Sequence, residues 1–182
     1  MKTCQQSNNK GFTLLELMLT LAIASILIGI ALFNTTELTT REKANNFAAE
    51  FKRHTKFARS KAITTGDPVI MCAMSNPGAT GACQNSWQTG TIVIFSDVNN
   101  NQSFDSSEDI LLRSVSNLVT GSKLVHNGGA TNIRFNQQGL VTAGQDGLFI
   151  FCPKGDNSFN VAVEILDSGT VRSRGKTNLA CG

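Results

Sequence analysis

A run of oxygen-bearing side chains between residues 97 and 108 has the spacing of a metal-binding loop. Carboxylates and amides stand at positions 1, 3, 5, 9 and 12 of this run: Asp97, Asn99, Asn101, Asp105 and Glu108. These are the ligand types and the spacing of an EF-hand calcium loop. Gln102, however, stands where such a loop has glycine. Two interpretations are therefore open, a calcium site or an Asx-rich loop in which Asn and Asp side chains cap their own backbone.

The C-terminal segment carries cations suited to a different chemistry. After Asp167 the chain has no acid, and Arg172, Arg174 and Lys176 follow one another at every second residue. Alternate side chains of a strand share one face, so we expect a single cationic row. Such a row suits contacts to a phosphate backbone. The alternative is a solvated edge strand whose charges discourage pairing with other edges.

The sequence contains no arrangement typical of a catalyst. It lacks the GxSxG, HExxH, P-loop and GxGxxG motifs, and Cys152 has no histidine at a recognisable spacing. His54 and His126 are isolated in the sequence, and we expect both at the surface. We therefore predict that the protein is not an enzyme and needs no cofactor, calcium in the loop at 97–108 being the one exception considered.

The elements that position these residues begin with an unusually apolar segment. From Phe12 to Phe33 the chain carries a single ionisable side chain, Glu16. As a helix this segment spans roughly 33 Å, which matches a hydrocarbon core about 30 Å thick. Glu16 there costs roughly 2.5 kcal/mol or more, and no small-residue cleavage site closes the apolar run. These features favour a retained transmembrane anchor over an ordinary secretory signal peptide. Lys2 and Lys10 precede it and predict a cytoplasmic N-terminus.

Helical periodicity continues beyond the apolar segment. Apolar residues recur on one face of a 3.6-residue period: Phe47, Phe51, Ala58 and Ala62. One helix is therefore expected over residues 12–63, transmembrane over 12–33 and amphipathic over 34–63. Residues 41–61 hold seven Lys or Arg against two Glu. This excess is typical of a solvated face, and the alternative is a phosphate-binding stripe.

Short β-rich runs separated by Gly, Asn and Asp clusters make up the rest of the chain, residues 64–182. The predicted strands are 69–74, 91–95, 110–115, 133–135, 148–152, 161–166 and 171–174. Helical segments do not alternate with these strands, so the sheet should be antiparallel. The predicted class is α+β, with a long N-terminal helix packed on an antiparallel β-sheet or sandwich domain.

Residues 10–16, Lys-Gly-Phe-Thr-Leu-Leu-Glu, resemble the leader junction of type IV prepilins and type II secretion pseudopilins. The resemblance implies that an inner-membrane prepilin peptidase removes a leader, residues 1–11, by cutting between Gly11 and Phe12, and that it methylates Phe12. It also implies a role for Glu16, which becomes the fifth mature residue. This carboxylate would pair with the N-terminal ammonium of a neighbouring subunit in a filament, so that two charges in hydrocarbon are neutralised.

Loss of the leader removes Cys4 and leaves an even number of cysteines. The four that remain are Cys72, Cys83, Cys152 and Cys181. In an oxidising compartment they predict two disulfides, for which three connectivities are possible. Short sequence separation favours Cys72 with Cys83, which leaves Cys152 for Cys181. A zinc site is the alternative, but the sequence has no CxxC pair and only two histidines.

Further blocks are similar to the FimT/FimU/GspH group of minor pilins and pseudopilins. They are Ala58 to Ala62, Val69 to Cys72, Cys83 before Trp87 and Gly90, and Phe95 to Asp97. The group implies a type IV pilin-like fold, with a helix packed on two β-sheets. It also implies a single-pass inner-membrane protein whose C-terminal domain lies in the periplasm. Its partners would be other pilins or pseudopilins, the prepilin peptidase and the inner membrane.

Two functions follow as expectations. The first is a structural subunit of a type IV pilus or a type II secretion pseudopilus, acting in filament initiation or at the tip. The second is capture of double-stranded DNA for uptake in natural transformation. FimT-type minor pilins are known for a C-terminal Gly-Arg-x-Arg motif, where this chain has Gly169, Thr170, Val171 and Arg172. The first arginine is thus replaced by threonine, the second is kept, and Arg174 adds a charge.

Overall fold

The computed structural model describes residues 11–33, 35–115, 118 and 120–181. These residues fall into two compact units, one that ends at Thr39 and one that begins at Thr40. Residues 1–10 of the predicted leader lie outside the described part, and with them Cys4 and the two leader lysines.

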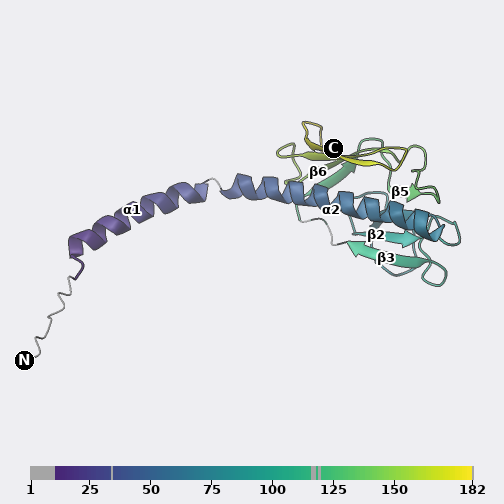
Figure 1. Ribbon diagram of the computed structural model, residues 1–182, viewed down its shortest axis with the longest axis horizontal. Coiled ribbons are helices and arrows are strands. Elements are labelled where there is room, and N and C mark those ends of the chain that lie inside the picture. Colours follow the sequence, from purple (N-terminus) through teal and green to yellow (C-terminus); the bar gives the residue numbers. More distant parts are fainter. Residues whose placement is uncertain (1–10, 34, 116–117, 119, 182) are drawn as a thin grey trace, which may run out of the picture. The chain divides into compact units, whose positions relative to one another are not determined.

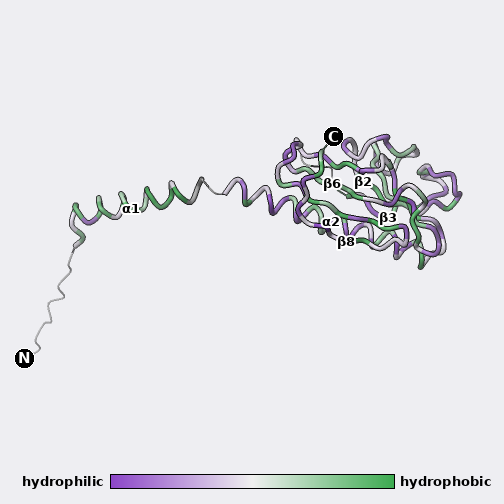
Figure 2. Tube along the Cα trace, turned by 90° about the horizontal axis from the view of Figure 1, so that it is seen from above, coloured by the Kyte–Doolittle hydropathy of each residue, from purple (hydrophilic) through white to green (hydrophobic). Residues whose placement is uncertain are grey.

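Helix α1, Leu14–Phe33, is dominated by apolar residues (Figure 2). Its first turn is capped by Thr13, whose hydroxyl accepts the backbone N–H of Glu16 at 3.3 Å. The hydroxyls of Thr20 and Ser25 donate to carbonyls three residues before them, at 2.9 and 2.8 Å. The polar groups of both side chains are thus satisfied by the helix itself, as a segment surrounded by hydrocarbon requires.

The large apolar side chains of α1 are exposed. Leu14, Leu15 and Met18 expose 77%, 76% and 63% of their surface. By length and composition, none of the described helices is apolar for long enough to cross a membrane alone. Residues Leu14–Ile30 qualify only when taken together with helix α2, Thr35–Thr65.

Helix α2 places a face of mostly small residues against the β-strands. Its buried residues are Thr40, Ala44, Ala48, Phe51, Thr55, Ala58 and Ala62. Small side chains allow the helix backbone to approach a sheet closely, and the hydroxyl of Thr55 is satisfied by the carbonyl of Phe51 at 2.8 Å. The helix ends where Gly66 adopts a φ of 77° and donates its N–H to the carbonyl of Ala62.

The described residues form eight strands in two four-stranded antiparallel sheets (Figure 1). The first sheet, in the order β3-β2-β1-β5, consists of β1 Val69–Met74, β2 Thr91–Ser96, β3 Ile110–Val115 and β5 Asn132–Phe135. The second, in the order β4-β6-β7-β8, consists of β4 Lys123–His126, β6 Gly147–Cys152, β7 Val161–Ile165 and β8 Val171–Lys176. A helix packed on antiparallel sheets confirms the predicted α+β class.

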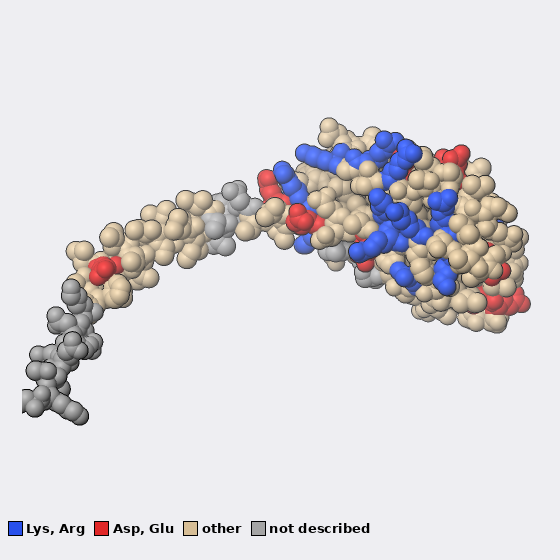
Figure 3. Space-filling model, viewed as in Figure 1, with Lys and Arg blue, Asp and Glu red and all other residues tan. Residues whose placement is uncertain are grey.

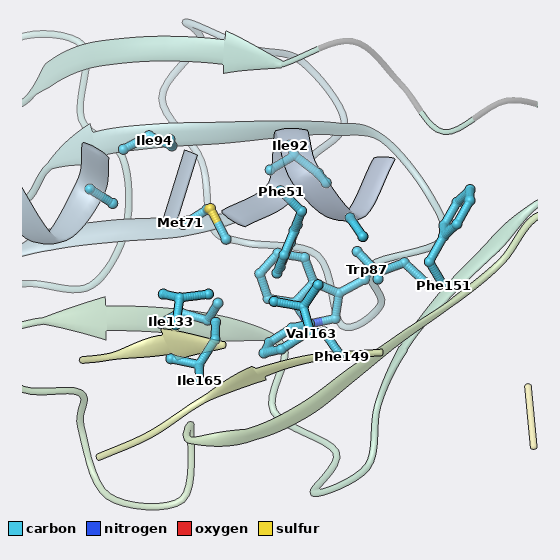
Figure 4. Close-up of a cluster of buried hydrophobic side chains, with 14 of the residues drawn as sticks. Phe51, Met71, Trp87, Ile92, Ile94, Ile133, Phe149, Phe151, Val163 and Ile165 are labelled. Atoms are coloured by element: carbon cyan, nitrogen blue, oxygen red, sulfur yellow. The ribbon is translucent and has the colours of Figure 1, made fainter. Parts of the chain in front are cut away.

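Aromatic rings from α2, from β6 and from the loop before β2 meet in the core (Figure 4). Phe51 of α2 lies 5.0 Å from the ring of Phe149 in β6, and the ring of Trp87 stands edge-on to Phe149 at 5.3 Å. The indole N–H of Trp87 donates to the carbonyl of Ala130 at 2.7 Å, so the one polar atom of this side chain is satisfied.

Two disulfides join the four cysteines of this unit, Cys72 to Cys83 and Cys152 to Cys181. This is the pairing that short sequence separation favoured. The first bridge closes the loop that follows β1. The second ties the C-terminal segment to the end of β6, and it forms a small buried cluster with Ile150.

Strand β4 and the position of His126 at its end differ from the sequence prediction. No strand was predicted over 123–126, and the expectation that His126 lies at the surface is wrong, because only 5% of this residue is exposed. Its ring packs against Phe149 at 4.7 Å between centroids. His54, on α2, is half-buried instead of exposed.

Candidate functional site

The predicted processing site lies just before helix α1. Gly11 and Phe12 are both exposed, and no atom lies within 4 Å of the position that a Cβ on Gly11 would occupy. Glu16, five residues beyond the predicted cut, is exposed in the first turn of α1. Both residues of the predicted cut and the predicted assembly residue are therefore exposed, and cleavage and pairing stay predictions.

Strand β8 carries the cationic row at the edge of the second sheet, where Arg172, Arg174 and Lys176 are all exposed. The guanidinium of Arg174 donates to a carboxylate oxygen of Glu164 in β7 at 2.7 Å. This hydrogen bond, and next the positive charges of Arg174 and Arg172, hold the pKa of Glu164 below its usual value. One carboxylate thus partly neutralises the row. Of the two arginines in the row, Arg172 forms no ion pair within the described part of the chain.

A β-bulge changes the face on which the last cation lies. Register pairs Glu164 with Arg172 and Val161 with Lys176, and an extra residue enters β8 between these pairs. Because Glu164 and Val161 are an odd number of residues apart on a regular strand, their partners point to opposite faces. The prediction of one row of three is therefore wrong for Lys176. Arg174 stays with Arg172, since both lie beside Glu164.

Cations of α2 extend this basic surface. Four of them recur at offsets of 11, 4 and 3 residues, which places them on one side of the helix: Arg41, Lys52, Lys56 and Arg59. Arg59 donates to the carbonyl of Gly139 at 3.1 Å and lies against Gly169 in the turn before β8. Arg41 lies 5.3 Å from the ring of Phe159, a cation–π contact. Figure 3 shows Lys and Arg side chains gathered over this face of the molecule.

The loop at 97–108 is ordered by its own backbone. Asp97 is fully buried and accepts N–H groups from Asn101 and Gln102 at 3.0 and 3.3 Å. The guanidinium of Arg134 lies 3.6 Å from the other oxygen of Asp97. Asn99 donates to Glu108 at 2.8 Å. These contacts are the ones expected of an Asx-rich loop.

The predicted calcium ligands are engaged in hydrogen bonds within the loop. Asp105 accepts the N–H and the hydroxyl of Ser107, and these hydrogen bonds lower its pKa. Within the described part of the chain, no three His, Cys, Asp or Glu side chains converge closely enough to hold a metal ion. Calcium binding stays a prediction.

Two carboxylates that contact the candidate site residues were not identified from the sequence. Asp109 accepts the N–H groups of Val98 and Asp105 and so supports the loop from its far end. Glu164 pairs with Arg174. In a hairpin that pairs residue 165 with residue 171, residue 164 lies opposite residue 172, so the antiparallel register next to the turn could have revealed this carboxylate. The contact of Asp109 depends on loop geometry that has no sequence signal.

Comparison with known families identifies two segments of the chain. A model described as type II transport protein GspH matches residues 48–169. A model of the prokaryotic N-terminal methylation motif matches residues 6–32. Among curated proteins, none matches this chain in sequence.

Solved structures show the same fold. The type IV minor pilin FimU of Pseudomonas aeruginosa (strain PAO1), in a crystal of space group P21, aligns with a TM-score of 0.56 and 15% identity. The alignment covers 76% of this chain and 93% of FimU. A second FimU crystal form, space group P65, gives a TM-score of 0.53 at 15% identity over 72% of this chain and 93% of FimU.

Proposed function

Because this chain belongs to the family of type II transport protein GspH, we propose that it is a minor pilin or pseudopilin that acts in filament initiation or at the filament tip. Its anchor would be α1 in the inner membrane, with the unit from Thr40 onward in the periplasm. The observation that carries the proposal is a helix whose large apolar side chains are exposed, directly preceding a folded GspH unit. A helix that is apolar on every side, and whose large side chains are exposed in the described part of the chain, needs hydrocarbon or other helices around it.

Glu16 supports assembly with other pilins. It is the one ionisable residue of α1, and it is exposed, so its carboxylate is accessible to an external partner. Removal of the leader at Gly11 would create an ammonium group on Phe12. A carboxylate and an ammonium from neighbouring subunits would neutralise each other where hydrocarbon penalises each alone.

Processing and assembly can be tested separately. Gly11→Ala should leave an unprocessed precursor, visible as a larger species on a gel, because the peptidase is expected to require glycine immediately before the cut. Glu16→Ala should be processed normally but fail to enter filaments. Thr20→Ala is the matched control, because its hydroxyl bonds only to its own helix. Normal processing of Gly11→Ala, or filaments of normal composition with Glu16→Ala, would contradict the proposal.

DNA capture is a second candidate function, favoured by the basic surface. Arg172 and Arg174 share a face of β8, and α2 carries four further cations on the side where Arg59 meets the turn before β8. Phosphate contacts release counterions, so affinity for duplex DNA should fall steeply with salt. Replacing Arg172 with Gln should lower the salt slope by roughly 0.9, the value of one phosphate contact.

The control for this experiment lies at the opposite edge of the same sheet. Lys123→Gln removes a charge from β4 and should leave the salt slope unchanged. Full-length protein, a duplex of mixed sequence and a salt series are sufficient. An affinity that does not depend on salt, or equal losses in Arg172→Gln and Lys123→Gln, would exclude DNA contact through β8.

A further inference from the structure

A cavity of about 440 Å³ opens between α2 and strands of both sheets. Its apolar lining includes Phe47 and Phe51 of α2, Met71 of β1, Ile92 of β2 and Phe151 of β6, four of which are labelled in Figure 4. The rings of Phe47 and Phe151 are stacked, with centroids 3.9 Å apart. The volume lies within the roughly 300–1,000 Å³ typical of small-molecule pockets, and an aromatic lining is typical as well.

Cations gather at one end of this cavity. Lys43 and Lys154 both line it and are exposed, and neither forms an ion pair with a carboxylate in the described part of the chain. Lys154 lies 5.3 Å from the ring of Phe159, the same ring that Arg41 contacts. Arg41 is two residues from Lys43 on α2. Both lysines therefore belong to the end of the cavity near the start of α2.

The opposite end of the cavity has a different character. Glu50 and His54 line it farther along α2, with His54 about 16 Å beyond Lys43 at 1.5 Å of rise per residue. The two side chains lie 3.6 Å apart and so engage each other. The cavity is thus elongated along the helix, and of the described residues that line it only the two lysines at the first end carry an unpaired positive charge. The charges of Arg53 and Arg113 reach His54 from outside the lining.

The strands that line the cavity favour a hydrocarbon occupant over a peptide. The edge strand β3 reaches the cavity only through Val115, its last residue. Strands β1, β2 and β6, which supply Met71, Ile92 and Phe151, are internal in their sheets, so their backbone groups are paired on both sides. An extended peptide would find no ladder partner on these strands, and its buried N–H and C=O groups would remain unsatisfied. A hydrocarbon chain carries no such groups.

We propose that this cavity binds an anionic single-chain amphiphile, with its acyl chain along Phe47, Phe51 and Phe151 and its acidic head between Lys43 and Lys154. Lys43 is only ten residues beyond the end of α1. That the ligand comes from the bilayer rests on the proposed function, because α1 must then be anchored in that bilayer. Binding itself does not depend on filament assembly.

The chain contains a single tryptophan, Trp87, which provides the readout. Its ring lies 6.4 Å from that of Phe51 in the cavity wall. Full-length protein in phosphatidylcholine vesicles would be titrated with cis-parinaric acid, a fluorescent fatty acid that accepts energy from tryptophan. We expect saturable energy transfer that palmitate displaces more effectively than hexadecanol, which has the same chain without the charge.

Variants decide where the probe binds. The double variant Lys43→Gln with Lys154→Gln should weaken parinarate binding about tenfold, because both charges that face the head are removed. Lys52→Gln with Lys56→Gln is the matched control on the same helix, outside the cavity, and should bind as the wild type does. Asn46→Phe, at an exposed lining position, should reduce binding by filling the entrance.

The proposal would be overturned by energy transfer that does not saturate, by equal displacement with palmitate and hexadecanol, or by equal affinities in both lysine pairs. Displacement of the probe by an apolar peptide but not by palmitate would assign the cavity to a partner protein and would also overturn it. Failure of the proposed filament function is distinguishable, because it would appear as normal filaments and secretion in cells that lack the protein, with parinarate binding unaffected.

Discussion

Burial of His126 predicts that the folded protein loses stability in mild acid. Its Nδ1 accepts the N–H of Ala130 at 2.9 Å, and its Nε2 lies 3.0 Å from the carbonyl of Asp146. The ring must therefore be neutral, with its proton on Nε2. Burial is the main cause that lowers the pKa of His126 below 6.5, against the smaller opposing effects of Asp146.

The sign follows from proton uptake on unfolding. Below pH 6.5 the unfolded chain protonates His126 while the folded chain resists, so the free energy of unfolding falls as pH falls. The binding of one extra proton by the unfolded chain lowers the free energy of unfolding by at most about 1.4 kcal/mol per pH unit. This slope applies between pH 6.5 and the lower pKa that His126 has in the folded state. A protonated ring would also set Nδ1–H against the N–H of Ala130, so that this half-buried donor would lose its partner.

Urea unfolding followed by Trp87 fluorescence between pH 5 and 8 measures this effect. Trp87 is well placed to report it, because its indole donates to the carbonyl of Ala130, the residue whose N–H bonds to His126. His126→Gln should be less stable at pH 8 but should lose less stability toward pH 5. His54→Gln is needed as a second variant, since burial also lowers the pKa of His54. Identical pH slopes in wild type and His126→Gln would refute the reasoning.

Other perturbations follow from packing and chain geometry. Phe51→Ala should lower the free energy of unfolding by about 3–5 kcal/mol, measured in urea, because Phe51 touches both Trp87 and Phe149; a loss below 1 kcal/mol would contradict its place in the core. Replacing both Cys152 and Cys181 with Ser should cost about 3.6 kcal/mol from loop entropy, against about 2.8 for Cys72 and Cys83, since the bridges span 29 and 11 residues; the reverse order would contradict the entropic argument. Gly169→Ala should lower the melting temperature far more than Gly175→Ala, although both glycines have positive φ. The reason is that a Cβ at Gly169 would fall 2.1 Å from the carbonyl oxygen of Gly139, whereas a Cβ at Gly175 would meet no atom within 4 Å. Equal melting temperatures of the two variants would refute this. Millimolar calcium should not raise the melting temperature more than magnesium does, because Asp97 is already engaged by backbone N–H groups and Arg134; a calcium-specific rise that Asp105→Ala abolishes would favour the calcium interpretation.

The elements with a strong period could be predicted from the sequence. Strands β1 and β3 occupy the predicted residues, since their apolar and β-branched runs end at Gly, Asn and Asp clusters. The buried face of α2 contains Phe51, Ala58 and Ala62 as predicted. Local periodicity is sufficient here, because the same side chains that create the pattern are the ones that are buried.

Strand β4 shows where local periodicity fails. Its four residues are too few to establish an alternation, and the strand ends in a histidine that was expected at the surface because it is isolated in the sequence. In the structure Leu124 and His126 are buried while Lys123 and Val125 are half-buried, a regular two-residue period. His126 can be buried because Ala130 and Asp146, neither of them marked by any sequence motif, satisfy both ring nitrogens.

The cations of β8 show a different limit, because their residue types were identified correctly and their shared face was not. Alternation assumes an unbroken ladder, and one extra residue in β8 moves every later side chain to the other face. Gly175, which has a φ of 70°, is the one sequence signal at this bulge, because glycine inside a strand is typical of such a site, and the predicted alternation took no account of it. For DNA contact the consequence is specific: Arg172 and Arg174 act on one face together with Glu164, so Glu164→Gln should strengthen duplex binding, whereas Lys176→Gln should change it little. Equal losses of affinity in Arg172→Gln and Lys176→Gln would show that the three cations do act as one row.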